Sequence, residues 1–347
     1  MSIPIPPLAA REPTRLEHHG DVRIDDFYWL RNRTDPRVLA YLESENAYTA
    51  AMLDHCEAVR VQLFAEMRSR QQENDCSVPD QIDDYLYYQC TREGQQYPIY
   101  CRRRGSMEAA EEILLDVNAL AVGEAYAHVD NVRISPDHRL LAYSFDNHGD
   151  ETYTLYIKDL ATGQLLAERI PNTYYGLEWG NDSRTLYYTL LDAAKRPCQV
   201  YRHRVGEDAA NDELLFTESD LRFELHLRKS KSRALILIKS KSNTSSEEWF
   251  LDADDLQARP VVIAARRPDI EYSVSHHNQR FYITTNEEAR NFRVMVAPVA
   301  SPGREHWQEV IPHRPSILVQ GTEAFRDYMV VYEREAGFRH LGVINLG

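Results

Sequence analysis

The chain has 347 residues, of which 54 are acidic and 40 are basic, so its formal net charge at pH 7 is −14, and 43% of its residues are hydrophobic. A charge of this sign excludes a protein that binds nucleic acid by neutralising phosphates, and it disfavours binding to an anionic membrane surface. The hydrophobic fraction excludes disorder, and the length predicts roughly two domains.

The sequence carries no signal for export, membrane insertion or metal binding. It lacks an apolar run of about 18 residues, which excludes a transmembrane helix. The first ten residues have neither the basic start nor the long apolar core of a secretory signal. The five cysteines are odd in number and form no CxxC pair, which predicts neither a disulfide framework nor a zinc site. We therefore expect a cytoplasmic protein without a cofactor or metal ion.

The first part of the chain, residues 1–80, is predicted to form a helical arm. Asp35 followed by Pro36 is a typical helix start, because Asp caps the free N–H groups and Pro suits the first helical position. Apolar residues then recur at steps of mostly three and four, as on one face of a helix: Val38, Tyr41, Leu42, Tyr48, Met52, Cys56, Val59 and Leu63. A turn near Asp54 would divide this stretch into two helices.

From Asp84 onward the sequence predicts short β-strands separated by turns. These segments are rich in aromatic and β-branched residues, which suit a pleated and half-buried surface. They are Tyr85–Gln89, Tyr97–Tyr100, Leu140–Phe145, Thr154–Lys158, Leu165–Glu168, Thr185–Thr189, Leu235–Ile238, Arg280–Thr285, Tyr328–Tyr332 and Leu341–Ile344.

A repeat organises these strands. Polar turns that end in arginine precede the longer apolar runs, and these arginines stand 45 to 49 residues apart, at Arg139, Arg184, Arg233, Arg280 and Arg326. A period in the forties with several short strands is typical of β-propeller blades, whereas a β-sandwich gives no reason for such a repeat. The fold is therefore predicted to be mainly β, with a propeller over residues 81–347 whose blades begin near residues 84, 129, 175, 223, 271 and 317. The sixth blade would lack its outer strand.

The residues themselves offer no complete catalytic apparatus. There is no Gly-x-Ser-x-Gly nucleophile turn, no phosphate-binding glycine loop and no HExxH pair. The loop Asp146–Glu151 only loosely resembles a calcium loop and is interpreted as a blade loop. Paired acidic residues are interpreted as solvated turns: Asp25–Asp26, Asp83–Asp84 and Glu287–Glu288. The adjacent histidines His18–His19 and His276–His277 would point to opposite faces of a strand and could not both bind one metal ion without a bend. The series His128, His138 and His148 is interpreted as surface turn residues. No catalytic or metal-binding residue is predicted, and substrate-binding residues stay unassigned.

Several motifs in one order resemble the prolyl oligopeptidase family of serine peptidases, and within it the oligopeptidase B group. The stretches that carry the resemblance are Asp26–Arg31, Val38–Tyr48, Glu178–Ser183 and Arg266–His276. The resemblance implies a seven-bladed propeller that caps an α/β-hydrolase domain, with the helical arm alongside that domain. It also implies cleavage of short peptides after arginine or lysine, with the propeller excluding folded proteins by size.

The catalytic serine, aspartate and histidine of that family have no counterpart in this sequence. The resemblance would place them beyond Gly347, together with the seventh blade and the end of the sixth. We therefore expect a fragment that lacks the α/β-hydrolase domain, is truncated in the sixth blade and is inactive alone.

Three functions follow as hypotheses. In the first, the chain is the gating and substrate-filtering part of a peptidase. Its partners are then the hydrolase domain and short basic peptides, which the charge of −14 would attract. Neither nucleic acid nor a membrane is expected as a partner. Tyr28, Trp29 and Leu30 would then lie at an interdomain interface, although such residues also serve as core anchors. In the second, the propeller is a stand-alone scaffold for protein interactions. In the third, it is an enzyme with its own site in the central channel.

Overall fold

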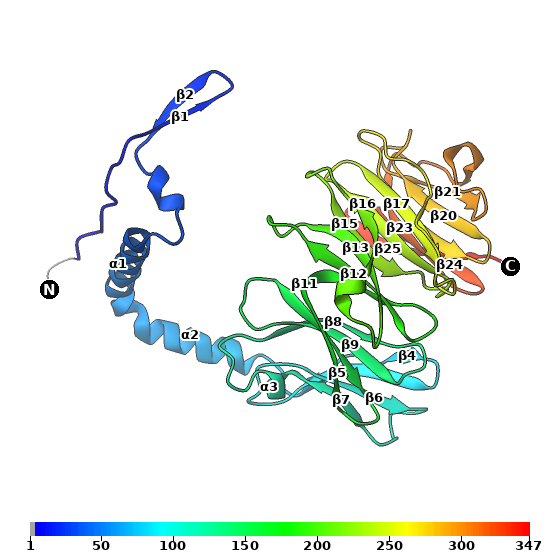
Figure 1. The fold of residues 1–347 in the computed structure, drawn as a ribbon, viewed down its shortest axis with the longest axis horizontal. Helices are drawn as coiled ribbons and strands as arrows, with labels where there is room; N and C mark the ends of the chain where they lie inside the picture. Colours follow the sequence, from blue (N-terminus) through cyan, green and yellow to red (C-terminus); the bar gives the residue numbers. More distant parts are fainter. Residues whose placement is uncertain (1–3) are drawn as a thin grey trace. The chain divides into compact units, whose positions relative to one another are not determined.

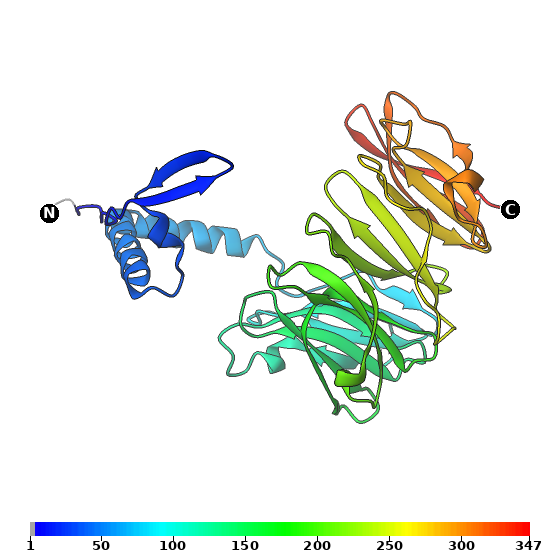
Figure 2. The ribbon, with the colours of Figure 1, turned by 45° about the horizontal axis from the view of Figure 1, so that its top comes forward.

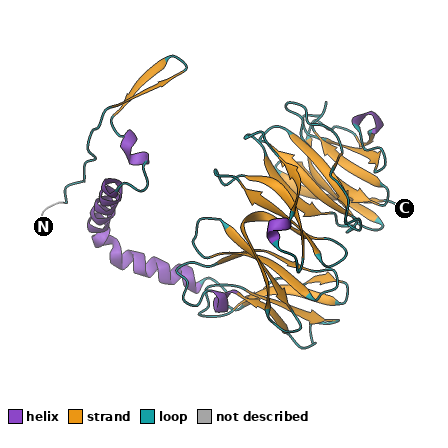
Figure 3. Ribbon diagram, viewed as in Figure 1, coloured by secondary structure: helices purple, strands orange, loops and turns teal. Residues whose placement is uncertain are grey.

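The computed structural model describes residues 4–347, so the first three residues of the expected helical arm lie outside the described part. The chain divides after Asp75 into two compact units, which we call the arm and the propeller. Figure 3 shows that the longer helices belong to the arm and that most strands belong to the propeller. In the described residues, no helix is both long and apolar enough to cross a membrane.

The arm contains two helices, as predicted, and a hairpin that was not predicted. Its elements are β1 (Thr14–His18), β2 (Asp21–Asp25), a 3₁₀ turn (Tyr28–Arg31), α1 (Pro36–Leu53), a 3₁₀ turn (Asp54–Cys56) and α2 (Glu57–Ser69). The Asp35 carboxylate accepts a hydrogen bond from the Arg37 N–H at the start of α1, which confirms the expected cap. The hairpin turns at His19 and Gly20, both with positive φ, a conformation that suits a two-residue hairpin loop.

The propeller consists of six blades of antiparallel strands, which lie side by side in chain order in Figures 1 and 2. Blade 1 contains β3 (Asp75–Cys76), β4 (Asp80–Ile82), β5 (Tyr85–Thr91), β6 (Ile99–Arg104) and β7 (Glu112–Asp116), followed by the short helix α3 (Val117–Leu120). Blade 2 contains β8 (His128–Ile134), β9 (Leu140–Asp146), β10 (Tyr153–Asp159) and the first part of β11 (Leu165–Trp179). Blade 3 contains the rest of β11, β12 (Thr185–Leu191), β13 (Pro197–Arg204) and β14 (Glu213–Thr217).

The remaining blades follow the same order. Blade 4 contains β15 (Glu224–Lys229), β16 (Leu235–Lys241), β17 (Ser246–Asp252) and β18 (Val261–Val262). Blade 5 contains β19 (Tyr272–His277), β20 (Arg280–Thr285), β21 (Arg293–Pro298) and β22 (Gln308–Ile311). Blade 6 has three strands, β23 (Ile317–Ala324), β24 (Tyr328–Glu335) and β25 (Phe338–Asn345). The predicted fold class, a propeller of about six blades with an N-terminal helical arm, is confirmed.

The predicted starts of blades 2 to 6 agree with the structure to within a few residues. Blades 2 and 3 share β11, whose first part pairs with β10 and whose last part pairs with β12; Thr173 has a partner in both. Blade 1 differs from the prediction, because its first strand is supplied before residue 84 by the short strands β3 and β4. These segments are too short and too polar to give a strand pattern in the sequence.

The repeated turn joins the first strand of a blade to the second. In blades 2 and 3 an aspartate, Asp137 or Asp182, accepts a hydrogen bond from the backbone N–H two residues later. The residue between has positive φ, as in His138 and Ser183. Aspartate favours this turn because its short carboxylate replaces a backbone acceptor.

The hydrophobic cores lie between blades rather than within them. Leu155 and Ile157 of blade 2 pack with Leu177 and Leu186 of blade 3, and equivalent clusters fill the other boundaries. Each sheet therefore buries apolar side chains on its neighbours, which is how a propeller obtains a core from small repeated sheets. Among the described residues of the arm, by contrast, only Val38 is fully buried.

Candidate functional site at the centre of the propeller

The first strands of the blades form the inner layer of the propeller. At each boundary from blade 2 to blade 6 a side chain of one first strand donates a hydrogen bond to a backbone carbonyl of another. The pairs are Asn131 to Tyr174 (3.1 Å), Lys229 to Trp179 (2.9 Å), Arg228 to Val274 (2.7 Å) and Ser275 to Thr322 (3.2 Å). These bonds hold the strands that surround the centre.

A cavity of about 450 Å³ lies where first strands meet, lined by residues of blades 1 to 4. Glu178 on β11 lines the cavity. Its pKa is raised because the effect of burial outweighs the attraction of the Arg133 guanidinium, whose Nε lies 3.5 Å from the Glu178 carboxylate. Lys229 on β15 has a lowered pKa, also because of burial. The lining of the cavity thus includes a carboxyl group and an ammonium group, those of Glu178 and Lys229, whose pKa values are shifted by burial, which makes the cavity the main candidate for a polar ligand site.

The turn Ser230–Leu235 of blade 4, which we call the blade-4 turn, connects four other blades. The Arg233 guanidinium donates to both carboxylate oxygens of Asp83 in blade 1, at 3.1 and 2.9 Å. The other contacts are Lys231 to Glu323 of blade 6 (2.8 Å), Ser232 to His276 of blade 5 (2.7 Å) and Asn181 of blade 3 to the Arg233 carbonyl (3.1 Å). This turn therefore ties the centre of the propeller together at one end of the first strands.

Asp83 is the second anchor of this network. Its pKa is lowered mainly by the hydrogen bonds from Arg233, which outweigh the effect of partial burial, and His138 lowers it further. His138 Nε2 lies 3.2 Å from Asp83, and its Nδ1 lies 2.6 Å from the Tyr87 hydroxyl. Asp83 thus joins blades 1, 2 and 4, and both Asp83 and Arg233 line the cavity.

The residues expected at an interdomain interface lie in the 3₁₀ turn of the arm. Tyr28, Trp29 and Leu30 are all half-buried. The Trp29 indole donates to the Ala10 carbonyl at 2.9 Å, and the Arg37 guanidinium lies 5.0 Å from the centre of its ring. These contacts fix the turn within the arm, and the interface role stays a prediction.

Besides Asp83, two other members of the acidic pairs that were interpreted as turns bind arginine side chains. Asp84 lies 3.7 Å from Arg104, and Glu287 binds both Arg267 and Arg304. The Asp146 carboxylate accepts three backbone N–H groups of its own loop, so these bonds hold the loop in shape. Within residues 4–347 no group of three or more His, Cys, Asp or Glu side chains is placed to hold a metal ion.

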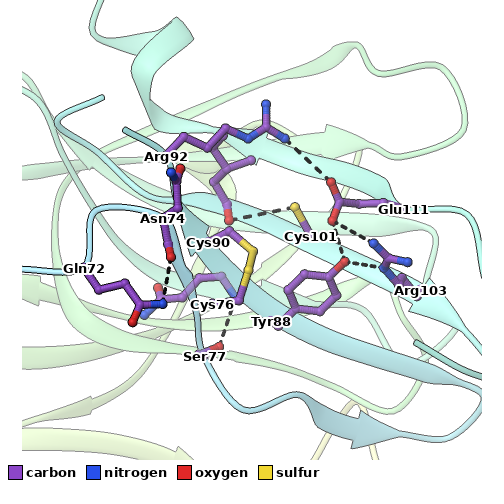
Figure 4. The surroundings of a disulfide bond; sticks show 12 residues. Gln72, Asn74, Cys76, Ser77, Tyr88, Cys90, Arg92, Cys101, Arg103 and Glu111 are labelled. Atoms are coloured by element: carbon purple, nitrogen blue, oxygen red, sulfur yellow. Dashed lines mark hydrogen bonds and ion pairs between the residues drawn. A yellow bond between two sulfur atoms is a disulfide. The ribbon is translucent and has the colours of Figure 1, made fainter. Parts of the chain in front are cut away.

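One expectation about the cysteines was wrong. Cys76 on β3 and Cys90 on β5 form a disulfide, with Cα atoms 4.1 Å apart (Figure 4). Cys56, Cys101 and Cys198 are free. The odd cysteine count and the lack of CxxC could not reveal this pair, because it depends on β3 lying beside β5 within blade 1. Cys101 lies in the same small apolar cluster, and burial raises the pKa of its thiol to about 11.

Comparison with known proteins decides the family. Residues 6–347 match the model of the prolyl oligopeptidase N-terminal β-propeller domain. The chain belongs to the prolyl oligopeptidase family. Protease 2 of Moraxella lacunata is 37% identical, and the match covers 98% of this chain and 50% of that protein. Dipeptidyl aminopeptidase BI of Pseudoxanthomonas mexicana is 36% identical, with the same coverage of both chains. This member of the prolyl oligopeptidase family therefore spans about half the length of the curated relatives it matches.

Solved structures of oligopeptidase B also match this chain over about half of their own length. The enzyme from Leishmania major superposes on all of this chain with a TM-score of 0.94 and 29% identity, and the match covers 51% of that structure. The enzyme from Trypanosoma brucei, solved in a closed form with covalently bound antipain, gives a TM-score of 0.92 and 27% identity over 99% of this chain. The resemblance to the oligopeptidase B group is confirmed.

Proposed function

We propose that this chain is the non-catalytic gating and filtering propeller of an oligopeptidase B-like serine endopeptidase that cleaves short peptides after arginine or lysine. The observation that carries the proposal is the cavity between the first strands, bounded by the Asp83–Arg233 contact of the blade-4 turn. A space of this size admits an extended peptide segment but not a folded domain.

The second part of the proposal is that an α/β-hydrolase domain is the partner of this chain. Two apolar surfaces support it. On α2, Phe64 and Met67 are 65% and 68% exposed, and on the edge strand β25, Leu341 and Val343 are 69% and 68% exposed. Exposed apolar patches of this kind mark interaction surfaces, and an open sheet edge favours pairing with further chain.

Peptidase assays test the proposal. The purified chain, offered a fluorogenic dipeptide with arginine at the cleavage position, should show no turnover. The full-length gene product should cleave it and should reject the same site within a folded protein. The hydrolase part made without this chain should lose that discrimination. Discrimination that persists without the chain would show that the filter lies elsewhere, and turnover by the chain alone would contradict its non-catalytic role.

Hydrogen exchange tests the proposed interface. The backbone amides of Tyr28, Trp29 and Leu30 should exchange more slowly in the full-length protein than in this chain, because the partner domain would cover them. The amides of the exposed β1–β2 hairpin serve as the control and should not change. Equal exchange of Tyr28–Leu30 in both proteins would assign these residues to the arm alone.

The cytoplasmic location stays a prediction, and the disulfide gives it a test. Thiols can be trapped with an alkylating reagent in intact cells before lysis. In a reducing cytoplasm Cys76 and Cys90 should be labelled as thiols, because disulfides there are kept reduced. If Cys76 and Cys90 escape labelling because they are already joined in a disulfide in the intact cell, the protein is located in an oxidising compartment.

A further inference from the structure

Four tyrosines and one carboxylate gather at the other end of the first strands, and we call them the tyrosine cage: Tyr126, Asp130, Tyr153, Tyr174 and Tyr175. The ring of Tyr153 lies 6.3 Å from that of Tyr174 and 6.2 Å from that of Tyr175, measured between ring centres. Tyr175 is 48% exposed and Tyr126 is 41% exposed, so the cage combines buried and accessible ring surface. It joins blade 2 to the first strand of blade 3.

The position of the cage follows from strand direction. Asn131 contacts Tyr174, and further along both strands Trp179 donates to the Arg133 carbonyl, so these first strands run in parallel. The cage lies where they begin, whereas the turns that follow them, including the blade-4 turn, lie at their other ends. The cage is therefore separate from the Asp83–Arg233 contact.

The carboxylate of Asp130 is incompletely compensated. Its Oδ2 is buried and has no hydrogen-bond partner in the described part of the chain, and no ion pair joins Asp130 to a cationic side chain there. Ser144 is its direct partner across β8 and β9, and the buried Ser144 hydroxyl is also without a hydrogen bond. A buried carboxylate oxygen without a donor is costly, and binding of a cationic donor would remove that cost.

Some other tyrosines of the propeller already have an arginine over the ring. The Arg102 guanidinium lies 4.4 Å from the ring centre of Tyr85, and that of Arg169 lies 4.7 Å from Tyr156. Within residues 4–347, no arginine or lysine lies over the rings of the cage.

His128 Nδ1 lies 2.9 Å from the Tyr153 hydroxyl, and the charged neighbours that raise the pKa values of the buried Tyr153 and Tyr174 are carboxylates. Burial is the main reason that the pKa of Tyr153 is raised, and the neighbouring Tyr175 and then Asp130 raise it further. The pKa of Tyr174 is likewise raised by burial and by Tyr175, with smaller effects from Glu151 and Glu224. The electrostatic field at these rings therefore favours a positive group.

We infer that the tyrosine cage binds the cationic side chain, guanidinium or ammonium, of a basic residue in a peptide. Aromatic faces attract such a cation electrostatically, and the Asp130 carboxylate adds a charge-assisted hydrogen bond. This site rests on the proposed function only in that the peptide is a substrate of the peptidase. It would hold a basic residue of that peptide at the propeller.

A binding assay on the 347-residue chain tests the inference. The probe is a short fluorescent peptide with blocked ends and one arginine, and the matched probe has citrulline, a neutral isostere, at that position. We expect the arginine peptide to bind at least about tenfold more tightly, because only the cation gains from the rings and the carboxylate. A third probe with a free amino terminus and citrulline separates a terminal ammonium from a side chain. Tighter binding of that probe than of the arginine peptide would overturn the assignment to a side chain.

Variants locate the binding. Asp130→Asn and Tyr175→Ala should each reduce arginine-peptide affinity to the level of the citrulline peptide. The controls are Asp84→Asn and Tyr328→Ala, which make the same chemical changes at exposed positions and should leave binding unchanged. Tyr175 is exposed, so its truncation should leave folding intact; circular dichroism checks this.

Equal binding of the arginine and citrulline peptides, or wild-type affinity in folded Tyr175→Ala, would overturn the inference. The peptidase assays described above are independent of this result. If binding depends on the cage but the full-length protein cleaves no basic peptide, the site stands as a cation-binding site and the proposed function fails.

Discussion

Removing the hydroxyl of Tyr272, at the boundary between blades 4 and 5, should lower the free energy of unfolding of the propeller. The Tyr272 side chain is 99% buried, and its hydroxyl donates to the Ala264 carbonyl at 2.6 Å while it accepts from the Glu248 N–H at 2.7 Å. Tyr272→Phe keeps the ring, but the Ala264 carbonyl and the Glu248 N–H stay buried and lose the hydroxyl as their hydrogen-bond partner. At about 1–3 kcal/mol for each unsatisfied group, we expect the free energy of unfolding to fall by about 2–6 kcal/mol.

Urea denaturation followed by tryptophan fluorescence measures this change, because Trp307 packs edge-on against the Tyr272 ring at 5.7 Å. Tyr328→Phe is the matched control: Tyr328 is 41% exposed, so its hydroxyl is hydrated and its loss should change the free energy by less than about 0.5 kcal/mol. A loss below about 0.5 kcal/mol in Tyr272→Phe would refute the argument, since it would mean that the two backbone groups find water or another partner.

Two further predictions concern blade 1. Cys90→Ser should lower the free energy of unfolding by about 3 kcal/mol, because the Cys76–Cys90 bond closes a short loop, whereas Cys56→Ser, at a free cysteine, should have little effect. Equal urea midpoints for the two variants would contradict this. The lowered pKa of Asp83 means that its contact with Arg233 stabilises the fold above about pH 4 and is lost as pH falls through the folded-state pKa. The protection of the blade-4 turn amides from exchange, relative to the intrinsic rate at each pH, should therefore fall on acidification in the wild type but not in Asp83→Asn; a parallel fall in both would exclude Asp83 as the cause.

The sequence was most informative where a residue's role is local. The Asp35 cap, the break near Asp54 and the blade starts all depend on side chains acting within a few residues, and a repeat multiplies that signal. The hairpin at His19 and Gly20 escaped prediction because its strands are short and exposed. Its positive-φ turn is a weak signal when apolar alternation is missing.

The site was less predictable because its contacts join distant parts of the chain. Asp83 was noticed only as one of many acidic pairs, and Arg233 only as part of the repeat; they are 150 residues apart in sequence. Cys76 and Cys90 are closer in sequence but meet only because β3 lies beside β5. Likewise Asp130 and Ser144 become partners only through the register of β8 and β9. Such pairings follow from tertiary structure and leave no mark in spacing or composition.

Arg233 shows how a departure from the repeat can indicate function. When the turns are superposed on their hydrogen bonds, Ser135, Gly180 and Ser230 are equivalent, so Arg233 occupies the positive-φ position of His138 and Ser183 rather than the position of Arg139. Ser232 likewise stands where blades 2 and 3 have the turn-closing aspartate. The blade-4 turn thus replaces the aspartate contact with a longer local hydrogen bond, from the Ala234 N–H to the Ser232 hydroxyl at 3.4 Å, and gains long-range contacts.

A positive φ of 62° at Arg233 costs about 1 kcal/mol relative to glycine, and an exposed ion pair returns about the same. Arg233→Gly should therefore leave the free energy of unfolding nearly unchanged while it removes the contact with Asp83. If that contact gates the cavity, the full-length variant should accept longer peptides at wild-type stability, measured by the lengths of peptides it cleaves. Lower stability with an unchanged length limit would instead assign Arg233 to folding. In Arg233→Gly, the relief of the backbone conformation and the loss of the ion pair have opposite effects on the free energy of unfolding. This variant therefore separates gating from stability more cleanly than Asp83→Asn does.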